Sequence, residues 1–183
     1  ATRLLGRVLE QQGHADWELK ASALSRALHS PELLRAAKLL NANDLAAAED
    51  ALRRYLQDHP AEPSAHMLLA DLATRLGRME EAETLLRRAL ELAPCYASAR
   101  FRLAQMLFDQ NRLEEAPEHF EALIEHWPDD PRFLDLKART FNRLGRVEDA
   151  AAIYQRMLSR DPGNGKTWAH YGHSLRFLGR QDE

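Results

Sequence analysis

Apolar side chains recur at three- and four-residue spacing along most of the chain, which is the period of an amphipathic helix. The arrangement of small, turn-forming and bulky residues repeats after every 34 positions. Its most regular markers are Pro60, Pro94, Pro128 and Pro162, and Ala48, Ala82, Ala116 and Ala150. Aligned on the prolines, four units run over 29–62, 63–96, 97–130 and 131–164, and each is predicted to contain two helices.

Three positions of each unit have the residue types that a pair of antiparallel helices requires. The eighth residues are Ala36, Ala70, Ala104 and Ala138; the fifteenth are Asn43, Gly77, Asn111 and Gly145; the twenty-fourth are Leu52, Leu86, Phe120 and Tyr154. Small alanines let two antiparallel helices approach closely, and the bulky residue fills the space between them. Gly or Asn tolerates the left-handed backbone that ends the first helix, and the proline stops the second. Pro117 is expected about one turn into a second helix, where its missing amide matters little.

This pattern resembles the tetratricopeptide repeat and stays in register over about three quarters of the chain. The resemblance implies an all-α fold, a right-handed superhelix (α-solenoid) of antiparallel helix pairs. It also implies a protein-protein interaction scaffold that binds a peptide or a helix in a concave groove and has no catalytic chemistry of its own.

Both ends depart from the regular pattern. Residues 1–28 match a degenerate repeat through Leu5, Gly6, Leu9, Gly13, Leu24, Ala27 and Leu28, and two unrelated capping helices are the alternative. Residues 165–183 match the first helix of a fifth repeat through Trp168, Tyr171, Gly172, Leu175 and Gly179. A half-repeat that exposes Trp168 and Tyr171 is a poor natural end, so we expect a domain cut from a longer protein.

Composition narrows the fold and the setting. Only 2 Val and 2 Ile stand against 29 Ala and 31 Leu, which disfavours a sheet-rich fold. No apolar run is long enough for a membrane span, and no secretory signal opens the chain. Cys95 is the only cysteine, so an internal disulfide is excluded and a reducing, cytoplasmic setting is expected. Residues 29–130 carry 11 basic and 19 acidic side chains, residues 131–183 carry 10 and 6, and neither segment resembles a nucleic-acid-binding arm.

The resemblance also implies which residues form the peptide-binding groove, because in this family it lies along the first helices. Carried over residue by residue, the groove is formed by Met67, Asp71, Arg75, Phe101, Gln105, Phe108, Arg132, Asp135, Arg139, Asn142, Arg143, Lys166, His173 and Arg176, with Arg102 and His170 at its margin. The C-terminal half of this set is cationic, and Phe101 and Phe108 are expected to be exposed anchors beside it. Such a surface suits an extended or helical partner segment with acidic and hydrophobic residues. A solvated helix face with incidental arginines is the alternative.

No motif predicts a cofactor, a metal or an active site. Gly165-Lys166-Thr167 resembles the end of a phosphate-binding loop. However, a helix is predicted before it, and Arg160 occupies the position where that motif requires its first glycine. His170 and His173 share a helical face without a third ligand, so partner contacts are the better interpretation. No convergent acid, base and nucleophile set stands out, which argues against an enzyme in this chain.

A second resemblance concerns the C-terminal end. It lies in Thr167-Trp168, Tyr171-Gly172-His173, Leu175 and Leu178-Gly179-Arg180-Gln181, which are similar to the repeat region of bacterial proteins that fuse tetratricopeptide repeats to a C-terminal sulfotransferase domain. That resemblance implies a fused catalytic domain using the sulfate donor PAPS, for which these residues offer no phosphate site. The alternative is a free-standing adaptor of an assembly or secretion complex.

Overall fold

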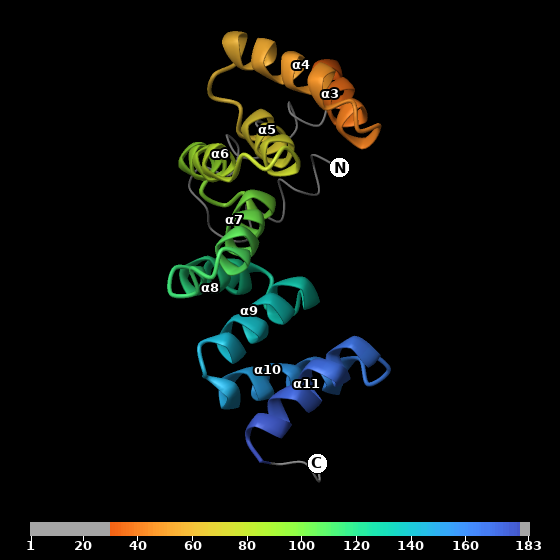
Figure 1. Ribbon diagram of the computed structural model, residues 1–183, viewed down its shortest axis with the longest axis vertical. Helices are drawn as coiled ribbons and strands as arrows, with labels where there is room; N and C mark the ends of the chain where they lie inside the picture. Colours follow the sequence, from red (N-terminus) through yellow and green to blue (C-terminus); the bar gives the residue numbers. More distant parts are fainter. Residues whose placement is uncertain (1–29, 180–183) are drawn as a thin grey trace. The chain divides into compact units, whose positions relative to one another are not determined.

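The computed structural model describes residues 30–179, which form helices and turns without any strand. Labelled as in Figure 1, the helices are α3 (Pro31–Asn41), α4 (Leu45–Asp58), α5 (Pro63–Arg75), α6 (Met79–Leu92), α7 (Ala97–Asp109), α8 (Ala116–His126), α9 (Pro131–Arg143), α10 (Val147–Arg160) and α11 (Gly165–Phe177). The predicted repeat or capping helices of residues 1–28, and residues 180–183, lie outside the described residues.

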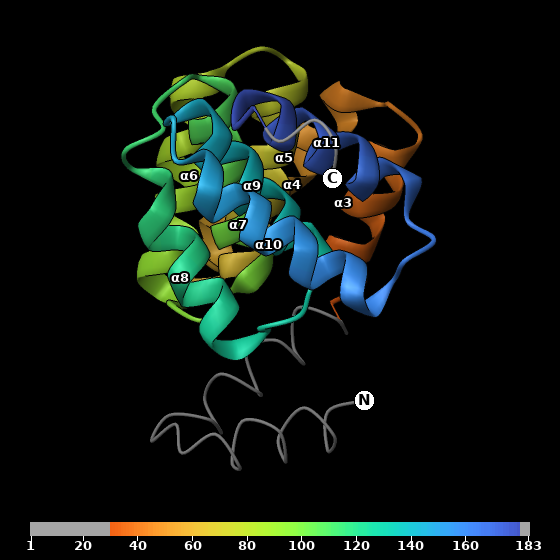
Figure 2. The same cartoon turned by 90° about the horizontal axis from the view of Figure 1, so that it is seen from below.

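The described residues divide into two compact units, residues 30–99 and 100–179. In the first unit, α3 packs on α4, α4 on α5, and α5 on α6. In the second unit, α8 packs on α9, α9 on α10, and α10 on α11, as Figures 1 and 2 show. The connections are short, which makes consecutive helices antiparallel neighbours. We call the odd-numbered helices the first helices of the pairs and the even-numbered ones the second helices.

The turns inside the helix pairs have the backbone that the sequence predicts. Asn43, Gly77, Asn111 and Gly145 have φ angles of 59°, 73°, 63° and 76°. In each turn the amide of the following residue reaches back across the helix end; for example, Arg78 N donates to Ala73 O at 2.8 Å and Arg146 N to Phe141 O at 2.8 Å. These bonds satisfy carbonyl groups that the helix end leaves unpaired.

Prolines end the second helices as expected, but one proline also shortens a helix. The helices α4, α6, α8 and α10 each stop two residues before Pro60, Pro94, Pro128 and Pro162. Pro117 does not lie one turn into its helix, because α8 begins only at Ala116. A helix continuing back to Leu113 would bring the proline ring against the carbonyl of that residue, so residues 113–115 form a turn instead.

The predicted core positions are buried in both units. The alanines of the eighth and twentieth positions, Ala36, Ala48, Ala70, Ala82, Ala104, Ala116, Ala138 and Ala150, are at most 1% exposed. Leu52, Leu86, Phe120 and Tyr154, at the twenty-fourth position, are at most 2% exposed. Close helix approach at alanine and one large side chain per pair therefore build each layer of the core.

Candidate functional site

The predicted groove residues lie on the first helices of both units. In the first unit they are on α5, where Met67 and Asp71 are half-buried and Arg75 is exposed. The Arg75 guanidinium donates a hydrogen bond from Nη1 to the carbonyl of Leu40, at the end of α3. Arg75 therefore ties the two first helices of this unit together and stabilises the carbonyl end of α3.

The second unit contains the larger part of the predicted groove, and there the expectation of two exposed phenylalanines is wrong. Phe108 is only 6% exposed, because two guanidinium groups cover its ring. Arg139 lies 4.7 Å and Arg143 4.6 Å from the ring centroid. Phe101 is half-buried and packs against Phe133, with ring centroids 5.3 Å apart. Cation–π stacking of Arg139 and Arg143 thus occupies the Phe108 ring that a partner was expected to contact.

Arg143 has a structural role like that of Arg75. Its Nη1 donates to the carbonyl of Phe108 at 2.9 Å, and its Nη2 donates to Oδ1 of Asn111 at 2.7 Å. Both bonds hold the end of α7, one repeat before Arg143. Arg143 therefore supports the helix stack, and we expect its reversal to Glu to lower the stability of the fold.

The structure brings four other predicted residues into one charged group, which we call the Asp135 cluster: Asp135, Arg139, Lys166 and His170. His170 Nδ1 lies 2.9 Å from Asp135 Oδ1, and Lys166 Nζ lies 3.5 Å from Oδ2 of the same carboxylate. Arg139 Nη1 is 3.8 Å from Oδ2. The Asp135 side chain is 16% exposed, against 40% for Arg139 and 71% for Lys166. One half-buried carboxylate from α9 thus meets basic groups of α9 and α11, and the cations project further into solvent.

The remaining predicted residues lie outside the Asp135 cluster. Asn142 Nδ2 donates to Oγ of Ser174 at 2.9 Å, and this bond joins α9 to α11. His173 lies 3.2 Å from an Arg176 guanidinium nitrogen and meets the Phe177 ring edge-on. Arg132 pairs with Asp130 at 2.6 Å. Gln105 is half-buried and Arg102 exposed on α7.

Two polar features of the structure escaped the sequence analysis. The Tyr154 hydroxyl is fully buried and has no hydrogen-bond partner within residues 30–179. Burial, and after it the nearby Asp135 carboxylate, raise the pKa of that hydroxyl. A tyrosine at a position held by Leu52, Leu86 and Phe120 elsewhere was the available signal.

The second feature is an ion-pair network on the second helices of the first unit. Glu49 on α4 accepts from Arg53 at 2.8 Å and from Arg78 at 2.6 Å, and both arginines also reach Glu81. Hydrogen bonds from Arg78 and Arg53 lower the pKa of Glu49 to about 2. Glu49 and Arg53 lie on α4, Glu81 lies on α6 and Arg78 directly precedes α6, and none of the four is a predicted groove residue.

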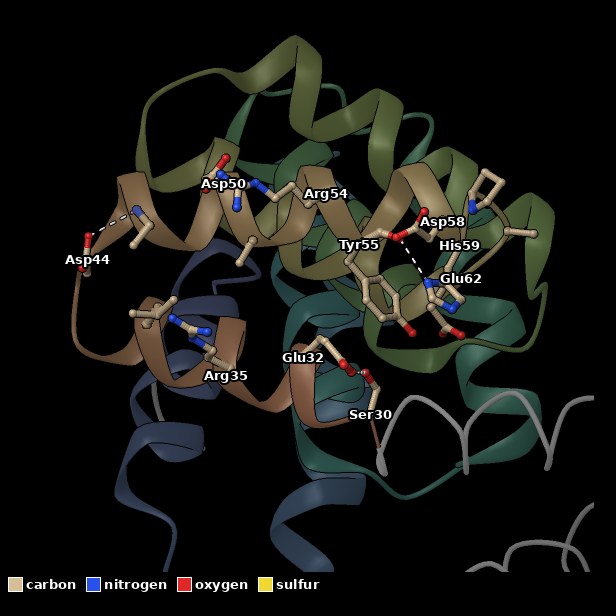
Figure 3. Close-up of a pocket in the computed structure, with 15 residues that line it drawn as sticks. Ser30, Glu32, Arg35, Asp44, Asp50, Arg54, Tyr55, Asp58, His59 and Glu62 are labelled. Atoms are coloured by element: carbon tan, nitrogen blue, oxygen red, sulfur yellow. Dashed lines mark hydrogen bonds and ion pairs between the residues drawn. The ribbon is translucent and has the colours of Figure 1, made fainter.

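The first unit also contains an open pocket between α3, α4 and the following turn (Figure 3). Tyr55 and His59 stack at 4.4 Å near the end of α4, across from Ser30 and Glu32 at the start of α3. Its charged side chains are largely engaged locally; Asp50, for example, pairs with Arg54 at 2.8 Å. No predicted groove residue lines this pocket.

Metal and phosphate chemistry find no support among the described residues. Over residues 30–179 no group of three or more His, Cys, Asp and Glu side chains is placed to hold a metal ion. Gly165, Lys166 and Thr167 open α11 directly after the turn that follows α10, so no strand precedes them. In the same part of the chain, no helix is both long and apolar enough to cross a membrane.

Comparisons with known proteins agree on the fold. The family model for the cytochrome c-type biogenesis protein H TPR domain matches residues 14–168. Among solved structures, MamA residues 41 to the end from Desulfovibrio magneticus RS-1 is 18% identical with a TM-score of 0.76, covering 82% of this chain and 85% of that one. YrrB, described as a TPR protein with an unusual peptide-binding site, is 15% identical with a TM-score of 0.74, covering 84% and 79%. A search of curated proteins finds no significant match.

These findings confirm the predicted all-α tetratricopeptide-repeat fold. The tetratricopeptide repeat is a protein-interaction fold without catalytic machinery, so the chain is a non-catalytic interaction scaffold with protein or peptide partners.

Proposed function

The chain belongs to the family of the cytochrome c-type biogenesis protein H TPR domain, and on that premise we propose that it binds an acidic, partly hydrophobic segment of a protein partner. The proposed contact surface is the first-helix face of the second unit, formed by α9 and α11. Within this surface, Arg139, Lys166 and Arg176 supply the cationic groups that a partner's carboxylates contact.

The observation that carries this proposal is an excess of exposed positive charge on α9 and α11. Arg132, Lys166 and Arg176 are exposed, and Arg139 is half-exposed. Arg132 pairs with Asp130 just before α9, and Asp135, the acidic residue within these two helices, is mostly covered. Stacking on Phe108 holds the Arg139 guanidinium in place, which lowers the entropy lost when it binds a carboxylate.

The family name favours the adaptor alternative over the sulfotransferase fusion. It refers to cytochrome c-type biogenesis, an assembly process, so we propose that the partner is a component of such an assembly. The YrrB title refers to a peptide-binding site in that protein, and this supports a peptide-like ligand. A fused sulfotransferase domain, the cytoplasmic location and the division into four repeats plus part of a fifth stay predictions. Reading the parent gene downstream of residue 183 decides between the fusion and the adaptor.

The binding surface is tested with a defined probe. A fluorescein-labelled peptide of alternating Glu and Leu is titrated with the full chain at low salt and followed by fluorescence anisotropy, with a Gln–Leu peptide for comparison. We expect the Glu–Leu peptide to bind more tightly and to weaken as salt rises. The double variant Arg139→Glu with Arg176→Glu should reduce affinity by about tenfold or more, since each substitution replaces a cation by a carboxylate that repels the acidic peptide.

A matched control changes the same net charge elsewhere. Arg54 and Arg88 lie on second helices, their side chains are 75% and 52% exposed, and each pairs with a carboxylate on its own helix. Arg54→Glu with Arg88→Glu should alter affinity by less than about twofold. Equal weakening by both double variants would mean that net charge alone, and not the α9–α11 face, governs binding.

A further inference from the structure

The Asp135 cluster places a carboxylate where an acidic partner is proposed to bind. We propose that Asp135 is an internal competitor: one carboxylate of the partner binds Lys166 and Arg139, and Asp135 weakens and thereby tunes that binding. The inference rests on the function proposed above and deepens it, because it assigns one subsite and the residue that sets its affinity.

The cluster is specific to one repeat. Asp135 stands at the position that Leu33, Met67 and Phe101 hold in the other repeats, so the usual residue there is apolar. Tyr154 likewise replaces apolar residues at its own repeat position. Burial, and after it the Asp135 charge, raise the pKa of its hydroxyl. Two polar exceptions thus occur together in one helix pair, and His170 on the next helix contacts both, at 2.9 Å from Asp135 and with its ring centroid 5.8 Å from that of Tyr154.

The three basic groups are unequally engaged by Asp135. The contact with His170 is short, whereas Lys166 at 3.5 Å and Arg139 at 3.8 Å are near or beyond the limit of a good charged hydrogen bond. Lys166 keeps 71% of its side-chain surface in solvent. Both cations therefore retain donor capacity toward solvent, where a second carboxylate can approach.

The electrostatic consequence has a definite sign. A partner carboxylate bound to Lys166 and Arg139 lies within a few ångströms of the Asp135 charge and is repelled by it. Neutralising Asp135 removes this repulsion and frees the two cations from their internal contact. The substitution Asp135→Asn keeps the side-chain shape and an oxygen that can still accept from His170. We therefore expect tighter binding of acidic segments after loss of an acidic residue from the scaffold.

The experiment uses the full chain and the Glu–Leu peptide described above, at low salt. Asp135→Asn should raise affinity about three- to tenfold over wild type. The gain should disappear in the double variants Asp135→Asn with Arg139→Gln and Asp135→Asn with Lys166→Gln. Arg132→Gln on the same helix, whose cation pairs with Asp130, serves as the control and should leave the gain of Asp135→Asn in place.

The outcomes separate this inference from the function on which it rests. If Asp135→Asn binds the peptide as wild type does or more weakly, while Arg139→Glu with Arg176→Glu still loses affinity, Asp135 is no competitor and the proposed surface stands. If the Gln–Leu peptide gains as much from Asp135→Asn as the Glu–Leu peptide, the gain is not carboxylate recognition and the inference fails. If neither wild type nor Asp135→Asn binds the Glu–Leu peptide at low salt, both proposals are overturned.

Discussion

The two units share one core design but place their central carboxylates on opposite kinds of helix. In the first unit Glu49 and Glu81, both on second helices, each pair with Arg53 of α4 and with Arg78 of the turn before α6. In the second unit the corresponding carboxylate is Asp135, which lies on a first helix and contacts basic groups of α9 and α11. A fixed core geometry therefore leaves the polar surface free to differ between repeats.

The difference teaches which polar contacts belong to the fold. Arg75 and Arg143 make the same contact in their own units, each donating to a carbonyl 35 residues earlier at the end of the preceding first helix. That contact recurs because the helix stack itself presents unpaired carbonyls there. Among residues 30–179 the Glu49 network and the Asp135 cluster do not recur, which makes them features of the individual repeats.

The largest expected effect tests the shared core. Ala70→Leu in the first unit and Ala138→Leu in the second should each lower the free energy of unfolding by about 1–3 kcal/mol, because both alanines are at most 1% exposed at the helix contact. Chemical denaturation measures both values. If either variant had the same free energy of unfolding as wild type, the two units would not share the same close helix packing at alanine.

A smaller effect should be common to the two arginine caps. Arg75→Gln and Arg143→Gln should each reduce stability by about 1 kcal/mol, since each removes a charge-assisted bond to a carbonyl at a helix end. Thermal unfolding compares them with Arg54→Gln, which changes an exposed arginine that pairs with Asp50 of its own helix. Unfolding temperatures that match the Arg54→Gln control would show that the recurring contact contributes nothing.

The Glu49 network should appear in the pH dependence of stability. In the folded protein the pKa of Glu49 is about 2, below the ordinary 4.5. The stabilisation that this carboxylate provides is therefore fully present above pH 4.5 and is lost as pH falls from 4.5 toward 2. Glu49→Gln should flatten that part of the stability curve and lower neutral-pH stability by less than about 1 kcal/mol. Denaturation curves at several pH values provide the measurement, and an unchanged acid slope would contradict the network's assigned role.

The smallest effect concerns the hydroxyl that distinguishes the second unit. Tyr154→Phe gives this repeat the residue that Phe120 supplies at the same position one repeat earlier. Because the buried hydroxyl has no partner among residues 30–179, its removal should change stability by no more than about 0.5 kcal/mol. A clear loss in chemical denaturation would mean that the hydroxyl is bonded in solution.

Most of the fold could be predicted from sequence because it depends on local rules. Gly or Asn at the turn and proline after the second helix act through backbone geometry, and Asn43 and Gly77 adopt the expected left-handed φ. Pro117 was misjudged because its effect depends on where the helix begins, and its ring moved that start to Ala116.

The candidate site was predicted less well. The first helices that carry it were identified, but the burial of Phe108 and the contacts of Arg143 with the end of α7 were not. Both depend on side chains about one repeat away in sequence, since Arg139 and Arg143 fold over a phenylalanine of the preceding first helix. Sequence spacing gives the face of a helix; it does not give which long side chains cross between helices.

The sequence by itself determined the repeat period, the helix-pair architecture, the buried alanine and bulky positions and the cationic excess of the C-terminal part, because each follows from residue type at a fixed period. The tertiary structure alone decided which charges stay available. Long basic side chains can bind any carbonyl, carboxylate or aromatic ring that packing brings within reach. Arg143 therefore became a structural residue, whereas Arg139 and Lys166 lie beside Asp135 with 40% and 71% of their side-chain surface exposed.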